Sequence, residues 1–142
     1  MTTKMKINHL AIAVHDINEA LTFWCDAMGL ELSHIESVPS QNAEVAFIPI
    51  GTGILELVKP TSDDTGLAIF IKNKGNGIHH ICIEVDDLDQ MITQLVEKNI
   101  RLINEKPDVL EGRRIVFIHP KSASGVLVEL CEIDKTDRDM VL

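Results

Sequence analysis

The sequence predicts an α+β fold of two tandem β-α-β-β-β modules, and the main reason is an internal repeat. The stretch Gly77–Val85 (GIHHICIEV) has the same form as Asn8–Val14 (NHLAIAV), and His80 follows His9 by 71 residues (80 − 9). In each stretch a histidine precedes alternating large and small residues, and a valine precedes an acidic turn. Such alternation is typical of a β-strand, so we expect each module to begin with a strand that carries a histidine.

A second repeat concerns a glutamate. Gly53–Leu57 (GILEL) resembles Gly125–Leu130 (GVLVEL), and Glu129 follows Glu56 by 73 residues (129 − 56). In a chain of 142 residues, each half is too small to bury its own apolar face. We therefore expect one domain over 1–142 in which both modules share a core. Its parts are module 1 at about 5–60, a connector at 61–76, module 2 at about 77–132 and a tail at 133–142.

The composition limits the partners that the protein can have. A formal net charge of −9 argues against nucleic acid, which requires a basic surface. An anionic small molecule remains compatible, because a local group of Lys and Arg can outweigh the net charge. No apolar run approaches membrane-spanning length, and the first residues lack the apolar core of a signal peptide. The three cysteines are widely spaced without a Cys-x-x-Cys motif, so we expect buried free thiols in a cytoplasmic protein.

The first module is expected to contain a helix and four strands. Asp16 can cap the helix, with Glu19 three residues later, and a stripe of apolar residues from Ile17 to Met28 has the spacing of one buried face. Gly29 suits the end of this helix, where a positive φ is common. The strands are expected at Lys6–Val14, Glu31–Val38, Ala43–Ile50 and Gly53–Val58, and a short connector helix at Leu67–Lys72.

The second module is expected to repeat this plan. Apolar residues from Leu88 to Val96 reproduce the stripe of the first helix at the 71-residue offset. The tail from Ile133 to Leu142 is charged and unpatterned, so we expect a frayed or loosely packed end. The strands are expected at Gly77–Val85, Arg101–Asn104, Arg113–His119 and Val126–Cys131.

Strand alternation predicts which polar side chains share a face. His79 falls on the bulky aliphatic face, which should pack against the helices, whereas His80 points to the other face. The same test places His9 beside small residues on the equivalent face of the first strand. Glu56 and Glu129 point away from the aliphatic residues that flank them, so both are expected on this face as well.

If the two sheets curl into one trough, these two histidines and two glutamates converge in it. Imidazole and carboxylate ligands suit a divalent cation such as Co, Mn, Zn, Ni or Fe, and the carboxylates balance its charge. Considered singly, a histidine in a strand is more often a hydrogen-bonded core residue, and a glutamate between leucines usually faces water. The matched positions in both modules favour the metal site over these readings.

Four segments carry a resemblance to a known family. They are NHLAIAV with the helix after it, GILELVKP, GIHHICIEVDD and FIHPKSASGVLVEL, and together they span nearly the whole chain up to the tail. The chain resembles the vicinal oxygen chelate superfamily and, within it, most resembles the methylmalonyl-CoA epimerases. The repeat and its His and Glu are shared by many members of the superfamily. GIHHICIEV, and HPK followed by GVLVEL, are more particular to the epimerases.

The resemblance implies a glyoxalase-like fold whose curled mixed sheets form a metal-binding trough. It implies the metal ligands His9, Glu56, His80 and Glu129, in a family whose bacterial members can have Gln at the slot of Glu56. It also implies an isomerase that interconverts (R)- and (S)-methylmalonyl-CoA, removing and returning the C2 proton through a metal-stabilised enolate. Glu129 and Glu44 are the implied catalytic acids. Glu44 alternates with neighbours of the strand in a way that is compatible with a place in the trough.

The resemblance further implies an acyl-CoA substrate and a homodimer, for which the sequence adds no independent support. The cations that could contact the phosphates of CoA are Lys121 and either Arg113 or Arg114. Cys82 and Cys131 are expected to line the trough or its edge without binding the metal. The remaining histidines, His15, His34 and His119, have no partner in the repeat, and we interpret them as surface or turn residues.

Two other functions are compatible with many of the same residues. Glyoxalase I isomerises a hemithioacetal at a very similar His-Glu-His-Glu metal site, so the ligands alone do not separate it from an epimerase; the GIHHICIEV and HPK motifs favour the epimerase. A non-enzymatic protein of the bleomycin-resistance type uses this fold as a ligand trough without needing a metal. The complete set of four ligand-type residues argues against that function.

Overall fold

The computed structural model describes residues 4–110 and 112–134, and the chain divides into two compact units. One unit is His9–His79, and the other combines Met1–Asn8 with His80–Leu142. Each unit is built on four strands. None of the helices in the described ranges is long and apolar enough to cross a membrane.

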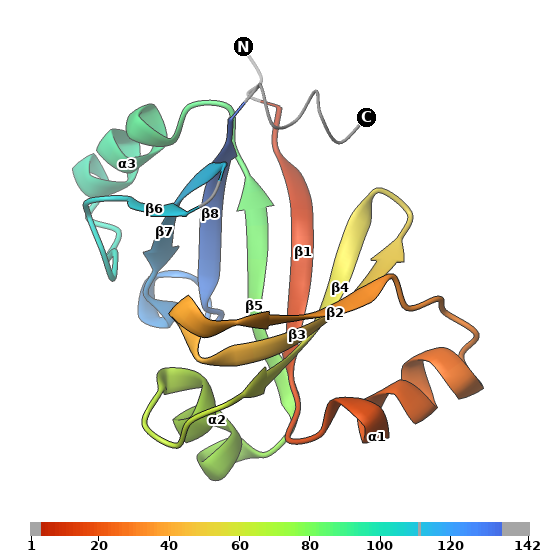
Figure 1. Cartoon of the computed structure of the whole chain (residues 1–142). Coiled ribbons are helices and arrows are strands. Elements are labelled where there is room, and N and C mark those ends of the chain that lie inside the picture. Colours follow the sequence, from red (N-terminus) through yellow and green to blue (C-terminus); the bar gives the residue numbers. More distant parts are fainter. Residues whose placement is uncertain (1–3, 111, 135–142) are drawn as a thin grey trace. The chain divides into compact units, whose positions relative to one another are not determined.

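The His9–His79 unit has a mixed four-stranded sheet in the order β2-β3-β4-β1 (Figure 1). β1 and β4 are parallel, and the other neighbouring pairs are antiparallel. Its elements are β1 (Lys6–Ala13, which begins in the other unit), α1 (Ile17–Leu21), the π-helix η1 (Thr22–Ala27), β2 (His34–Val38), the 3₁₀ helix η2 (Pro39–Gln41), β3 (Ala43–Ile50), β4 (Gly53–Pro60) and α2 (Gly66–Lys74).

The two faces of this sheet carry different residues. On one face, Leu55 and Leu57 of β4 pack with Ile17 of α1 and Trp24 of η1, and we call it the helix face. The other face carries His9 and is called the histidine face. At one end of the histidine face, small and β-branched residues of the sheet pack against α2; they are Ala11, Ala13, Ala43, Val45 and Val58, opposite Leu67, Phe70 and Ile71 of α2.

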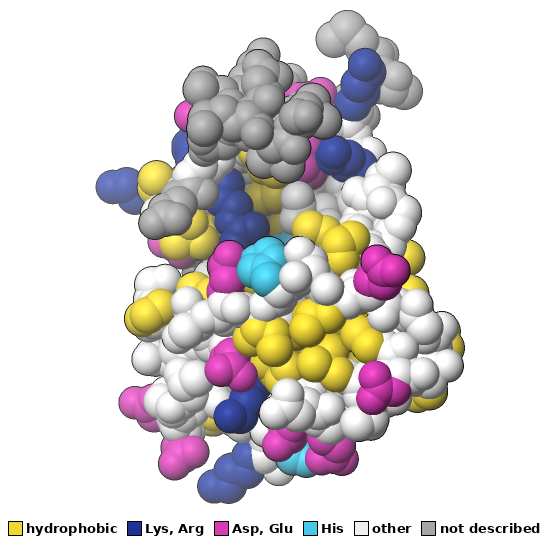
Figure 2. Space-filling model, turned by 45° about the vertical axis from the view of Figure 1, so that its right-hand side comes forward, with side chains coloured by type: hydrophobic (Ala, Val, Ile, Leu, Met, Phe, Trp, Pro, Cys, Tyr) yellow, Lys and Arg dark blue, Asp and Glu magenta, His cyan; other side chains and the backbone are white. Residues whose placement is uncertain are grey.

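The first helix begins as predicted but does not continue as one regular α-helix. The carboxylate of Asp16 accepts a hydrogen bond of 2.9 Å from the Glu19 backbone N–H, which caps α1. After Leu21 the chain continues in the π-helical η1, and Gly29 has the positive φ of 87° expected after a helix. Met28, which the stripe placed in the core, is 57% exposed. Figure 2 shows hydrophobic side chains gathered on one face of the molecule, with acidic side chains at the border of this patch.

The second unit has the strand order β5-β8-β7-β6, with α3 against one face (Figure 1). The helix face again carries aliphatic residues, among them Val116, Ile118 and Leu130, which pack with Leu88 of α3. The pair β5 and β8 is parallel, like β1 and β4. The elements are β5 (Gly77–Glu84, which begins in the first unit), α3 (Leu88–Glu97), β6 (Asp108–Leu110), β7 (Arg113–Ile118), the 3₁₀ helix η3 (Pro120–Ser122) and β8 (Val128–Ile133).

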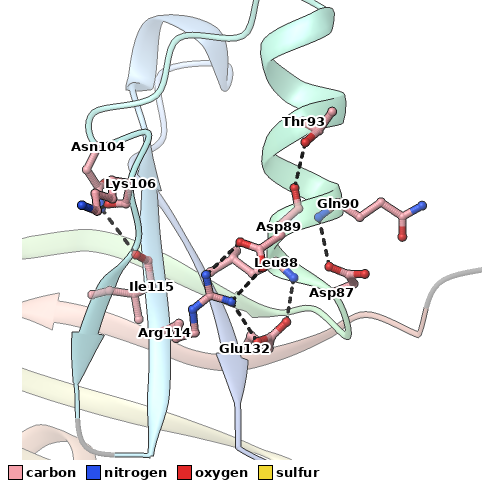
Figure 3. Close-up of polar contacts among 10 residues, drawn as sticks. All are labelled: Asp87, Leu88, Asp89, Gln90, Thr93, Asn104, Lys106, Arg114, Ile115 and Glu132. Atoms are coloured by element: carbon pink, nitrogen blue, oxygen red, sulfur yellow. Dashed lines mark hydrogen bonds and ion pairs between the residues drawn. The ribbon is translucent and has the colours of Figure 1, made fainter.

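Ion pairs and hydrogen bonds hold the start of α3 to this sheet (Figure 3). Arg114 of β7 makes two hydrogen bonds to Asp89, of 2.8 and 3.2 Å, and one of 3.3 Å to Glu132. Glu132 of β8 also accepts a hydrogen bond of 2.9 Å from the Leu88 backbone N–H, one of the N–H groups that no helix bond satisfies. Asp87 caps the helix through the Gln90 N–H at 3.0 Å. α3 is therefore fixed at its first turn.

Two predicted elements differ in the structure. Residues 101–104 form no named strand. Backbone hydrogen bonds of 2.8 Å join Arg101 to His119 and Ile103 to Phe117 around an isolated bridge at Leu102, but the pairing ends at Asn104, whose side chain accepts the Phe117 N–H at 2.8 Å. The edge strand is β6, further along the chain. Ile133 belongs to β8 rather than to the tail, and the tail from 135 to 142 lies outside the described residues.

Candidate metal centre

The histidine face of the His9–His79 unit holds a buried His–Glu pair. His9 is 2% exposed, and its Nδ1 lies 3.4 Å from Oε2 of Glu56. The parallel register of β1 and β4 sets Glu56 beside Ala11, two residues along the strand from His9. Because Ala11 is small, the carboxylate has room to reach the imidazole. Phe47 of β3 is the register partner of Glu56 on its other side.

The second unit repeats this arrangement. Nε2 of His80 lies 3.2 Å from Oε1 of Glu129, and their side chains are 13% and 5% exposed. The parallel register of β5 and β8 sets Glu129 beside Cys82, the repeat equivalent of Ala11. The ring of Phe117 lies edge-on to that of His80, with 6.1 Å between centroids, and Phe117 pairs with Glu129 in the sheet. The predicted pairing of one histidine with one glutamate on matched strands is thus present in each unit.

The donor set of each pair fits a divalent cation. Nitrogen and oxygen ligands about 2.1 Å from a zinc-like ion lie about 3.0 Å apart at right angles and about 3.4 Å apart at the tetrahedral angle. The N···O separations of 3.4 and 3.2 Å fall in or at the edge of this range. Burial of a carboxylate is costly unless a positive charge compensates it. A cation would supply such a charge to both glutamates.

Glu44 lies on the helix face, contrary to its predicted place. The register of β3 with β4 is continuous and pairs Glu44 with Lys59, Ala46 with Leu57 and Phe47 with Glu56. Residues that pair directly across antiparallel strands share a face, so Glu56 shares its face with Phe47 and not with Glu44. The alternation of Glu44 with Ala46 holds, but that face packs against α1 and η1. Alternation in the sequence divides the residues of β3 between two faces, but it does not determine which of these faces packs against the helices.

A polar pair on the histidine face of β2 could not be predicted from the repeat. Nε2 of His34 lies 3.0 Å from Oε1 of Glu36, and Nδ1 lies 2.9 Å from Oγ of Ser33. The imidazole stacks on Phe47, with 4.7 Å between ring centroids and 17° between planes. The register sets His34 opposite Phe47 and Phe47 opposite Glu56, so His34 is two strands from Glu56. His34 has no partner in the repeat, so the sequence predicts a surface or turn residue. In the structure its side chain is 50% exposed.

The two predicted trough cysteines are fully buried on the histidine face of the second unit. Sγ of Cys82 lies 3.4 Å from Sγ of Cys131, and no described cysteine forms a disulfide. The hydrogen bond to Cys131, and then burial, raise the pKa of the Cys82 thiol, so it stays protonated at neutral pH. Glu84, on the same face, is 5% exposed; it accepts a hydrogen bond of 3.3 Å from Asn8.

The predicted phosphate-binding cations differ in their surroundings. Arg114 is on the helix face and is engaged by Asp89 and Glu132. Lys121 lies in η3 and is exposed, and its backbone N–H donates to Nδ1 of His119 at 3.0 Å. Arg113 is half-buried on the histidine face, because it alternates with Ile115, which packs with the two buried cysteines.

Comparison with known proteins extends over both units. Residues 8–117 match the model of the Glyoxalase/Bleomycin resistance protein/Dioxygenase superfamily. The human mitochondrial methylmalonyl-CoA epimerase is 39% identical over 127 residues, which are 88% of this chain and 72% of the human protein. The ethylmalonyl-CoA/methylmalonyl-CoA epimerase of Cereibacter sphaeroides is 34% identical over 131 residues, which are 90% of this chain and 98% of that protein.

The solved structures agree. A methylmalonyl-CoA epimerase in complex with methylmalonyl-CoA and NH4+ is similar with a TM-score of 0.82 and 30% identity, over 92% of this chain and 96% of that one. The glyoxalase-like fold predicted from the sequence is thereby confirmed. The chain belongs to the Glyoxalase/Bleomycin resistance protein/Dioxygenase superfamily and, within it, to the isomerase family of the methylmalonyl-CoA epimerases.

Proposed function

We propose that this chain interconverts (R)- and (S)-methylmalonyl-CoA and that His9, Glu56, His80 and Glu129 together hold one divalent cation for this reaction. The observation that carries the proposal is the occurrence of one His–Glu pair on matched strands of each unit, at 3.4 and 3.2 Å. Two such pairs supply four ligands and leave coordination positions for substrate oxygens. Membership of the epimerase family supports the choice of substrate.

The reaction removes a proton from a carbon that lies between a thioester and a carboxylate. A bound divalent cation would act as a Lewis acid that favours the negative charge developing on the thioester oxygen. Glu129 is the proposed base for one face of the carbon. Its burial keeps bulk water away from the transferred proton.

Inversion requires a second group that delivers a proton to the opposite face of the carbon. The helix-face position of Glu44 argues against it in this role. We assign the role to the His34–Glu36 pair, which lies on the histidine face with Nε2 and Oε1 3.0 Å apart. At about 4.8 Å per strand, His34 lies about 10 Å from Glu56 across the sheet, with Phe47 on the strand between them, so a small acyl group bound over Phe47 would lie near both.

The test is proton–deuterium exchange at C2 of methylmalonyl-CoA. Protein stripped with a chelator should show no exchange, and addition of Co²⁺ or Mn²⁺ should restore both exchange and inversion. The Glu129→Gln variant, which keeps the shape of the side chain, is expected to bind metal more weakly and to lose exchange. Thermal unfolding of this variant serves as the control for its fold.

The rival functions give different results in the same experiment. Turnover of methylglyoxal plus a thiol, without exchange of methylmalonyl-CoA, would replace the proposal by glyoxalase I. Freshly purified protein that contains no divalent metal, and that shows no turnover of either substrate after metal is added, would favour a non-enzymatic binding protein.

A further inference from the structure

The second unit contains a pair of buried thiols that the proposed reaction does not use. Cys82 of β5 and Cys131 of β8 are both 0% exposed, and their sulfur atoms lie 3.4 Å apart. Both lie on the histidine face, where they pack with Ile115 of β7. Two thiols this close meet an ion or an oxidant together, so their geometry indicates which of these the pair suits.

The internal repeat shows that the fold does not require thiols at these positions. Ala11 is the repeat equivalent of Cys82, and Val58, two residues after Glu56, is the equivalent of Cys131. Ala11 and Val58 are buried and pack with α2 as ordinary apolar residues of the sheet. The pair of thiols is therefore a feature of the second unit alone, and alanine and valine are side chains that the same architecture already accepts there.

The strands hold the two cysteines too far apart for a relaxed disulfide. In the register Cys131 pairs with Glu84, which is two residues along β5 from Cys82. At about 4.8 Å between strands and about 3.3 Å per residue, the Cα atoms of the two cysteines are about 8 Å apart. A disulfide spans at most about 7 Å between Cα atoms unless the backbone moves. A sulfur–sulfur bond would therefore require the paired strands β5 and β8 to shift.

The separation of the sulfur atoms suits one metal ion bound by both. Thiolate sulfurs that each lie about 2.3 Å from a zinc-sized ion are about 3.8 Å apart at the tetrahedral angle and about 3.3 Å apart at a right angle. The observed 3.4 Å lies between these values. Thiolates favour soft, thiophilic cations, whereas carboxylates and water suit Mg²⁺ and Mn²⁺. The pair of thiols thus favours a different class of ion from a site made of carboxylates.

A third donor and a balancing charge lie close to the thiols. A carboxylate oxygen of Glu129 is within 4.8 Å of Sγ of Cys82, and the two residues pair in the register of β5 and β8. The hydrogen bond to Cys131 and burial outweigh the charge of Arg113, which by itself would lower the pKa of Cys82. A divalent cation and one guanidinium balance two thiolates and one carboxylate, so the assembled site is neutral, as burial favours.

We propose that Cys82 and Cys131 bind one thiophilic divalent cation, with Glu129 as its third ligand, in addition to the ion proposed above. Each thiol passes its proton to solvent as its metal–sulfur bond forms, and no electron is transferred. Because Glu129 serves both ions, a cation at the thiols weakens binding of the catalytic ion, and the reverse holds equally. This competition rests on the proposed function, whereas binding at the thiols does not.

The experiment titrates the whole chain, in reduced form, with Cd²⁺. Bonds between Cd²⁺ and thiolate sulfur absorb in the near ultraviolet, and its bonds to imidazole or carboxylate do not. We expect one equivalent of Cd²⁺ to produce this absorption in the wild type. Cys82→Ala and Cys131→Val introduce the residues of the first unit, and each should remove most of the absorption. Each should also weaken Cd²⁺ binding more than about tenfold, since even changes beside a metal ligand cost about 10–100-fold in affinity.

Cys25→Ala is the matched control, because it removes the third cysteine of the chain, which lies in η1 and outside the pair. It should keep the absorption of the wild type. Thermal unfolding without Cd²⁺ confirms that each variant folds.

Three results would overturn the inference. One is unchanged Cd²⁺ absorption and affinity in Cys82→Ala and Cys131→Val. Another is a wild type without this absorption whose thiols prove to be reduced after unfolding. The third is a loss of two hydrogens in the mass of protein treated with oxidised glutathione, if Cys82→Ala abolishes that loss, because the pair would then be a redox couple and not an ion site.

Competition with the catalytic ion is measured separately. Protein loaded with Mn²⁺, which binds thiolates poorly, should need more Cd²⁺ to reach the same absorption. Cd²⁺ should inhibit C2 exchange more strongly in the wild type than in Cys131→Val, and equal inhibition would contradict the shared role of Glu129. Cadmium–thiolate absorption in a protein that shows no C2 exchange would leave this site standing and remove the epimerase. Exchange in a protein without that absorption would do the reverse.

Discussion

The assignment of the second proton transfer is open to a direct test with Glu36→Gln. This change keeps the size of the side chain and removes the carboxylate that lies 3.0 Å from Nε2 of His34. General acid–base catalysis typically contributes about 10²–10⁴-fold to a rate. The side chains of His34 and Glu36 are 50% and 55% exposed, so water can partly replace the lost carboxylate in proton transfer. We therefore expect the low end of the range, a loss of about 100-fold in inversion, equivalent to about 2.7 kcal/mol.

The assay separates two events that the wild type couples. In deuterium oxide, exchange at C2 reports proton removal, and the appearance of the opposite enantiomer reports proton return on the other face. If Glu129 removes the proton from one enantiomer, Glu36→Gln should still exchange that enantiomer while inversion falls. Exchange starting from the other enantiomer should fall together with inversion.

Glu44→Gln is the matched control, because it makes the same chemical change on the neighbouring strand but on the helix face. Its exchange and inversion should stay within about threefold of the wild type, since a side chain away from the reacting carbon contributes no proton. A loss of inversion in Glu44→Gln with no loss in Glu36→Gln would refute the face assignment on which the mechanism rests.

Further predictions concern groups outside the reaction. The hydrogen bond that Nδ1 of His15 donates to Oδ1 of Asn76, followed by the charge of Glu19, raises the pKa of His15. Asn76→Ala should lower that pKa in an NMR titration. The stabilisation that His15 provides should be present at low pH and disappear as the pH rises through its pKa in the folded protein. Because its hydrogen bond to a second thiol and its burial raise the pKa of Cys82, a thiol reagent at pH 8 should label it only after unfolding, as mass spectrometry can show. Glu132→Ala should lower the free energy of unfolding by about 1 kcal/mol in urea, because it leaves the first N–H of α3 without its acceptor; Glu132→Gln, which keeps an acceptor, should cost less.

Most of the fold could be predicted because the repeat fixed the order of elements in both modules. Strand positions were found wherever alternation was regular, as in Ala43–Ile50, which matches β3. The prediction failed at 101–104, where backbone pairing with β7 is limited to a single bridge because the side chain of Asn104 takes up the next hydrogen bonds. Such side-chain pairing depends on a partner from another part of the chain, so local periodicity does not reveal it. The early end of α1 could not be predicted either. The stripe of apolar residues continues through η1, and its spacing does not distinguish the π-helical turns of η1 from an α-helix.

The pairs His9–Glu56 and His80–Glu129 could be predicted because duplication preserves both the residue type and the facing of the strand. The same reasoning cannot identify functional residues that one module has and the other lacks. For this reason the repeat did not identify His34 as a site residue. The sequence also could not distinguish Arg113 from Arg114, which the register of β7 and β8 places on opposite faces of the sheet.

The differences between the modules nevertheless follow from the proposed chemistry. A cation with four ligands can be held by two similar halves, but methylmalonyl-CoA has a thioester with a long anionic arm on one side of C2 and a small carboxylate on the other. Binding it in one orientation requires halves that differ. The first unit has Ala13 and Ala43 at the end of its histidine face that α2 covers. At the equivalent positions the second unit has the ionisable residues Glu84, which is buried, and Arg113. Residues that break the repeat are therefore where specificity for the substrate should be sought.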